Sequence, residues 1–142
     1  MKNNHAFTLT EILVVVVLLG VIAAFAIPNY AKSQRTAMEA DAVRQLKIIY
    51  AANQIYFSKQ NYYYSGCDVD TSIDDLNNGL GINLIENDLV YTYCQTSSTV
   101  YVATAEKPGD GGFTVTLSGD SPLSADNPCC FEGACPTLPS CS

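Results

Sequence analysis

Six cysteines offer the clearest chemistry in this 142-residue chain, and none lies in its first 66 residues: Cys67, Cys94, Cys129, Cys130, Cys135 and Cys141. An even number of cysteines in the polar part of a small chain is typical of a disulfide set formed in an oxidising compartment. The alternative is a four-cysteine metal site in the tail, but the tail has no C-x-x-C spacing. We therefore expect disulfides, no metal and no free thiol.

The pairing is only partly constrained by the sequence. Bridging two neighbours strains disulfide geometry, so Cys129 and Cys130 should bond to different partners. The four tail cysteines are expected to pair mostly among themselves or with Cys94, and a Cys67–Cys94 bond is the main alternative.

Glu11 is the second group that could do chemistry, because it is a lone carboxylate at the start of a long apolar run. From Ile12 to Ile27 the chain has no polar side chain, and counting from Phe7 the stretch has 21 residues. About 20 residues cross a bilayer as a helix, so a transmembrane helix over 7–28 is predicted. A carboxylate is costly in lipid unless it is paired, which indicates a purpose for Glu11 beyond anchoring.

Two simpler functions of this segment stay open. Lys2 and the Ala24-Phe25-Ala26 triplet fit a secretory signal with a cleavage site after Ala26. The segment could also be a plain membrane anchor with no further role.

Catalysis has little support in the composition. The only histidine is His5, and the chain has no phosphate-binding loop or dinucleotide fingerprint. We therefore expect no enzyme activity and no cofactor. Fourteen acidic against seven basic residues give a net charge of −7, which disfavours binding to nucleic acid by bulk charge. The acidic residues Asp68, Asp70, Asp74 and Asp75 do not fit an EF-hand, so a solvated loop is expected there rather than calcium.

Helical character continues beyond the apolar run. The stretch 29–58 has no Gly or Pro and is rich in good helix formers, while Gly20 and Pro28 are expected to kink the helix. One face of this stretch carries Glu39, Val43, Leu46, Tyr50, Asn53 and Phe57 at spacings of three and four. Ile48, Ala51 and Ile55 form a second apolar strip, which indicates either a second contact or a helix buried on both sides within its own fold.

The remainder, residues 59–142, is predicted to be a globular head. Ser72 could begin a short helix that ends near Gly79. Residues 89–94, 99–105 and 113–117 are predicted strands with short links, hence antiparallel neighbours. The tail after Ser118 is predicted to be a loop held by disulfides. The fold class is α+β: one long N-terminal helix, hydrophobic in its first half, packed against three or four antiparallel strands, with a disulfide-stapled C-terminal loop.

The N-terminal motif identifies a family. The sequence His5-Ala6-Phe7-Thr8-Leu9-Thr10-Glu11-Ile12-Leu13, the apolar run, Ile27-Pro28 and Tyr30 resemble the leader and first helix of type IV pilins and type II secretion pseudopilins. The close match covers residues 1–30. It departs from the family at Ala6, where Gly is usual before the cut, and at Thr10, where an apolar residue is usual.

The resemblance implies a leader of residues 1–6, cleaved by a prepilin peptidase between Ala6 and Phe7, and methylation of the new amine of Phe7. It also implies a pilin-like fold and a helical filament of identical subunits, built by an inner-membrane assembly platform. The subunit would sit in the inner membrane, in contact with the lipid bilayer, before assembly and in an extracellular pilus afterwards. The cysteine-rich tail favours a pilin over a pseudopilin; a small secreted disulfide domain is a further alternative.

Physical chemistry gives Glu11 a role in such a filament. The amine of Phe7 and the carboxylate of Glu11 lie about one helical turn apart, so the amine of an incoming subunit could pair with Glu11 of its neighbour and set the register. Glu11 resting at the headgroup boundary is the alternative. A helix over 7–58 would be about 78 Å long at 1.5 Å per residue. The 80-odd residues that follow cannot cover it, so its first half must find lipid or other copies.

Overall fold

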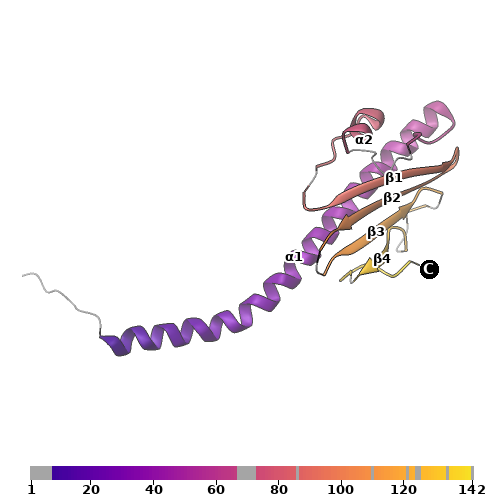
Figure 1. Cartoon of the computed structure of the whole chain (residues 1–142). Helices are drawn as coiled ribbons and strands as arrows, with labels where there is room; N and C mark the ends of the chain where they lie inside the picture. Colours follow the sequence, from indigo (N-terminus) through magenta and orange to yellow (C-terminus); the bar gives the residue numbers. More distant parts are fainter. Residues whose placement is uncertain are drawn as a thin grey trace, which may run out of the picture. The chain divides into compact units, whose positions relative to one another are not determined.

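The computed structural model of the chain describes residues 8–66, 73–85, 87–109, 111–120, 122–123, 126–133 and 135–141, and of residues 26–29 only the backbone. The chain divides into two compact units, one ending at Arg35 and one beginning at Thr36. The element order is two helices followed by four strands (Figure 1). The predicted α+β class, with its long N-terminal helix and antiparallel sheet, is confirmed.

The first helix, α1, runs from Leu9 to Gln60. It continues through Gly20 and Pro28, and the kink expected at these residues stays a prediction. It ends two residues later than the sequence predicts. Asn61 follows it with a φ of 61°, and its N–H donates to the Phe57 carbonyl at 2.8 Å. Asn tolerates this left-handed backbone conformation better than most residues, and here it closes the last turn of the helix.

The second unit contains a four-stranded antiparallel sheet in the order β1-β2-β3-β4. The strands are β1 (Val90–Ser97), β2 (Val100–Lys107), β3 (Phe113–Ser118) and β4 (Cys129–Gly133). The first three agree with the alternation in the sequence. A short helix, α2 (Ile73–Leu80), precedes them, and Gly81 follows it with a φ of 65°.

β4 differs from the prediction, because the sequence indicates a loop for the whole tail after Ser118. The strand has no alternation of apolar and polar residues; only Cys130 in it is buried. It pairs with β3 through Thr116↔Cys129 and Val115↔Cys130. Two disulfides that begin at its first two residues hold it there, so tertiary constraints rather than local pattern form this strand.

The core of the second unit lies between α1 and one face of the sheet. Leu46 and Ile49 of α1 are fully buried against inward-facing residues of the strands, including Tyr93, Tyr101 and Val115. Burial raises the pKa of the Tyr93 and Tyr101 hydroxyls, so both rings are neutral at physiological pH. The predicted inward face of α1 is confirmed, because three of its residues are buried and three are half-buried: Glu39, Leu46 and Asn53, and Val43, Tyr50 and Phe57.

The second apolar strip of α1 is covered by the unit's own core only at Ile48, which packs against the core cluster. Ile48 is half-buried, while Ala51 and Ile55 are exposed. All three line a groove between α1 and α2. Of the two interpretations left open by the sequence, burial of the helix on both sides within its own fold is therefore not what the structure has.

The tail is closed by two nested disulfides. Cys129 bonds to Cys141 and Cys130 to Cys135, as expected for adjacent cysteines. Cys94 is also disulfide-bonded, and its partner lies outside the described residues, as Cys67 does. The tail also returns alongside β4, where the Cys130 N–H donates to Pro139 O at 2.7 Å and the Cys141 N–H to Cys130 O at 2.9 Å.

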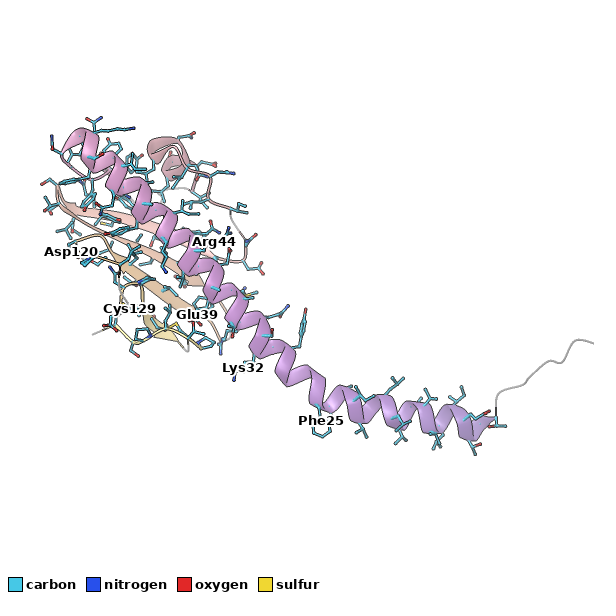
Figure 2. The ribbon with its side chains drawn as sticks, turned by 180° about the vertical axis from the view of Figure 1, so that it is seen from behind. Phe25, Lys32, Glu39, Arg44, Asp120 and Cys129 are labelled. Carbon is cyan, nitrogen blue, oxygen red and sulfur yellow. A yellow bond between two sulfur atoms is a disulfide. The ribbon has the colours of Figure 1, made fainter. Side chains whose placement is uncertain are left out.

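A buried carboxylate fastens this tail to α1. Glu39 is fully buried and accepts hydrogen bonds from the Thr137 N–H, at 3.1 Å and 3.3 Å to its two oxygens, and from the Thr137 hydroxyl. Figure 2 labels Glu39 on the stretch of α1 near the tail. Thr137 stands between Cys135 and Cys141, so the contact holds the middle of the disulfide-closed segment.

Replacing Glu39 by Ala should lower the free energy of unfolding by about 1–3 kcal/mol, because the buried acceptor of the Thr137 N–H and hydroxyl is lost. Urea unfolding of the full-length protein in mild detergent measures this. Glu106→Ala, at an exposed position on β2, is the matched control and should change stability by less than about 0.5 kcal/mol. Equal stability of the two variants would show that the Glu39–Thr137 contact does not hold the tail.

The double variant Cys129→Ser, Cys141→Ser should be less stable than the native chain by roughly 2–4 kcal/mol, because the unfolded state regains the entropy of an open loop. Thermal unfolding checks this, with Ser140→Ala as the control. In the native protein, alkylation under denaturing, non-reducing conditions should label none of the tail cysteines. Labelling of all four would contradict the pairing.

Candidate assembly site at the start of α1

Thr8 and Glu11 cap the N-terminus of α1 with reciprocal hydrogen bonds. The Thr8 N–H and the Thr8 hydroxyl both donate to Glu11 Oε2 at 2.8 Å, and the Glu11 N–H donates to Thr8 Oγ1 at 3.3 Å. This reciprocal pattern is a capping box, which satisfies helix donors that have no partner in the first turn. The T-x-x-E spacing is a signal that the sequence analysis could have used and did not.

The cap uses one oxygen of the carboxylate. Both hydrogen bonds that Thr8 donates to Glu11 end on Oε2. The Thr10 hydroxyl also lies 3.1 Å from Thr8 Oγ1, which adds a third polar group to the first turn. A carboxylate at a helix N-terminus is favoured by the helix dipole. The first turn therefore favours a negatively charged side chain at the start of an apolar helix.

The helix surface that follows Glu11 is apolar on all sides and open. Every side chain from Leu9 to Phe25 is exposed; Leu9 is 81% exposed and Phe25 72%. Figure 2 shows the side chains of this stretch spreading outward from the ribbon, with Phe25 labelled. Within the described residues, α1 is the one helix long and apolar enough to cross a membrane. A helix that is hydrophobic all round must be buried in lipid or protein.

Several residues named from the sequence lie outside the description. Ala6 and Phe7, the predicted cleavage and methylation positions, are among them, as are Asp68 and Asp70 of the acidic cluster. Asp74 and Asp75 are exposed in the first turn of α2. Among the described residues, no group of three or more potential metal ligands comes together.

Asp41 is a structural group that the sequence analysis missed. It accepts hydrogen bonds from Arg44 at 2.7 Å, Asn87 at 3.1 Å and Gln45 at 3.2 Å. Burial works to raise the pKa of Asp41, but the hydrogen bonds from these three residues outweigh it and hold the pKa below its ordinary value. Gln45 also bonds to both backbone groups of Ile85. The network thereby ties the segment before β1 to α1.

Comparison with known proteins agrees with the geometry. Residues 1–27 match the family model described as the prokaryotic N-terminal methylation motif, so the match spans the capping box and the apolar run. The chain is also 30% identical to the type IV major pilin protein PilA of Myxococcus xanthus (strain DK1622), in an alignment that covers 93% of this chain and 73% of PilA. No solved structure matches the chain.

The similarity to PilA extends well beyond the methylation motif, because it includes nearly all of the second unit. This chain has an apolar first helix that begins with a capped glutamate, and an α+β unit closed by disulfides. The chain belongs to the type IV pilin family.

Proposed function

We propose that this type IV pilin is a structural subunit that waits in the inner membrane and is then polymerised into an extracellular pilus. The observation that carries the proposal is the open, wholly apolar surface of α1 between Ile12 and Phe25. At roughly 25 cal/mol per Å², leaving such a surface in water costs far more than a small domain's stability. Lipid covers it before assembly, and the same stretch of other copies covers it afterwards.

The motif at residues 1–27 supports processing by a prepilin peptidase on the cytoplasmic side. In this proposal the peptidase removes residues 1–6 and methylates the new amine of Phe7. An assembly platform in the inner membrane then lifts the subunit into the growing filament. The chain itself performs no catalysis and carries no cofactor; its one histidine, His5, belongs to the leader.

Glu11 guides each addition. In the membrane-held subunit the capping hydrogen bonds from Thr8 offset part of the cost of a carboxylate near lipid. The Glu11 carboxylate accepts a hydrogen bond from the charged amine of the incoming subunit's Phe7, so that two opposite charges pair. Because the pairing works at one axial offset only, it also sets the register between neighbours.

The mature protein should begin at an N-methylated Phe7, since the proposed cut lies between Ala6 and Phe7. Intact mass and N-terminal peptide analysis of protein purified from filaments or membranes measures this. The matched variant Ala6→Gly restores the usual family residue and should be processed at least as fast. A mature chain that begins at Ile27 would instead support a secreted disulfide domain.

Glu11→Ala and Glu11→Gln should each leave membrane insertion intact and sharply reduce filament formation. Gln preserves a capping oxygen but removes the charge, so it separates capping from charge pairing. The measurement is the ratio of surface filament to membrane-held subunit. Thr10→Val, which alters polarity one residue away without touching the charge, is the control. Full filament yield from both Glu11 variants would show that Glu11 only rests at the lipid boundary.

A further inference from the structure

An open apolar groove lies between the last turns of α1 and α2. Its volume is about 610 Å³, and its apolar lining includes Ile48, Ile55, Leu80 and Ile82. Ile55 is 58% exposed, so the groove leaves apolar surface in contact with water. Lys59, in the last turn of α1, forms part of the same wall. The groove thus suits an apolar side chain accompanied by a negative charge.

The same unit presents such a group on β4. Phe131 is 70% exposed, more than any other large apolar side chain of the second unit among the described residues. The pairing of β4 with β3 passes from Val115↔Cys130 to Thr114↔Glu132, so Phe131 is an extra residue without a partner in the register. Bulges of this kind re-aim side chains. Glu132, the next residue, is exposed as well.

One subunit cannot place its own Phe131 in its own groove. β4 is one edge of the sheet and β1 is the other. α2 lies on the β1 side, because the Tyr64 hydroxyl bonds to Asp75 O while Tyr64 O accepts from Tyr93 of β1. Figure 1 shows α2 beside β1, with β4 at the opposite edge of the sheet.

Phe131 and the α1–α2 groove lie on different faces of the molecule, so a contact between Phe131 of one copy and the groove of another is heterologous. Repeated heterologous contacts build open helical filaments. The charge of the chain points in the same direction. At a net charge of −7, two copies repel each other unless a cation meets an anion at the contact. Lys59 beside the groove and Glu132 beside Phe131 provide that pair.

We propose that Phe131 of one subunit inserts into the α1–α2 groove of a second copy of this chain, with Glu132 of the first facing Lys59 of the second. This inference rests on the proposed function as a filament subunit and names the contact between the second units of neighbours. In this contact the bulge in β4 exposes Phe131, and the exposed apolar strip on α1 receives it. The contact acts in addition to the packing of the apolar start of α1.

The first test measures the ratio of surface filament to membrane-held subunit for variants of Phe131. Phe131→Ala should lower this ratio roughly tenfold, the size expected when one large apolar side chain loses its burial. Phe131→Leu, which keeps most of the apolar volume, should lower it much less. Val90→Ala on β1 is the matched control, because Val90 is 50% exposed and belongs to neither surface.

The second test reverses the charges. Lys59→Glu and Glu132→Lys should each reduce filament yield, and the double variant should recover most of it, since the pair is restored with opposite orientation. Equal amounts of oxidised, membrane-held subunit in every variant show that folding is unchanged. Normal yield from Phe131→Ala, or no recovery in the double variant, overturns this inference. Absence of filament from the native chain would instead overturn the proposed function.

Discussion

The structure depends on one constraint: from Ile12 to Phe25, α1 is apolar on every side and its side chains are exposed. From Leu9 to Phe25 each side chain is exposed, and the single charge in that stretch is Glu11. Water is a poor solvent for such a surface, so the protein exists either with lipid or with other copies around this helix. The Glu11 carboxylate is tolerated beside lipid because Thr8 supplies the hydrogen bonds that lipid cannot.

The second half of the same helix serves a different purpose, as the base on which the α+β unit is built. Leu46 and Ile49 supply apolar burial against the sheet. Two carboxylates then fix the parts of the unit that the sheet does not reach. Glu39 holds the disulfide-closed tail through Thr137, and Asp41 holds the segment before β1 through Asn87. Because Asp41 has a lowered pKa, its contribution is present above its unfolded-state pKa and is lost as the pH falls through its folded-state pKa.

The sequence was informative wherever local pattern decides structure. The long helix follows from apolar length and helix formers, and β1 to β3 follow from alternation. β4 could not be predicted, because the disulfides of Cys129 and Cys130 and the pairing with β3 hold it in place. Glu39 was predicted to lie on the same face of the helix as Leu46, but its partner Thr137 is 98 residues away, and no local pattern identifies that partner. The groove along Ile55 likewise exists only because α2 folds back beside α1.

Burial of the first half of α1 by different partners at different stages is the central claim, and site-specific photo-cross-linking tests it most directly. A photo-reactive amino acid at Val16, which is 61% exposed, reports which molecules touch the middle of the apolar stretch. In membranes before assembly it should link to lipid, and in purified filaments it should link one copy of the chain to another. Cross-links within a single chain in both states, or no difference between membrane and filament, would contradict the account.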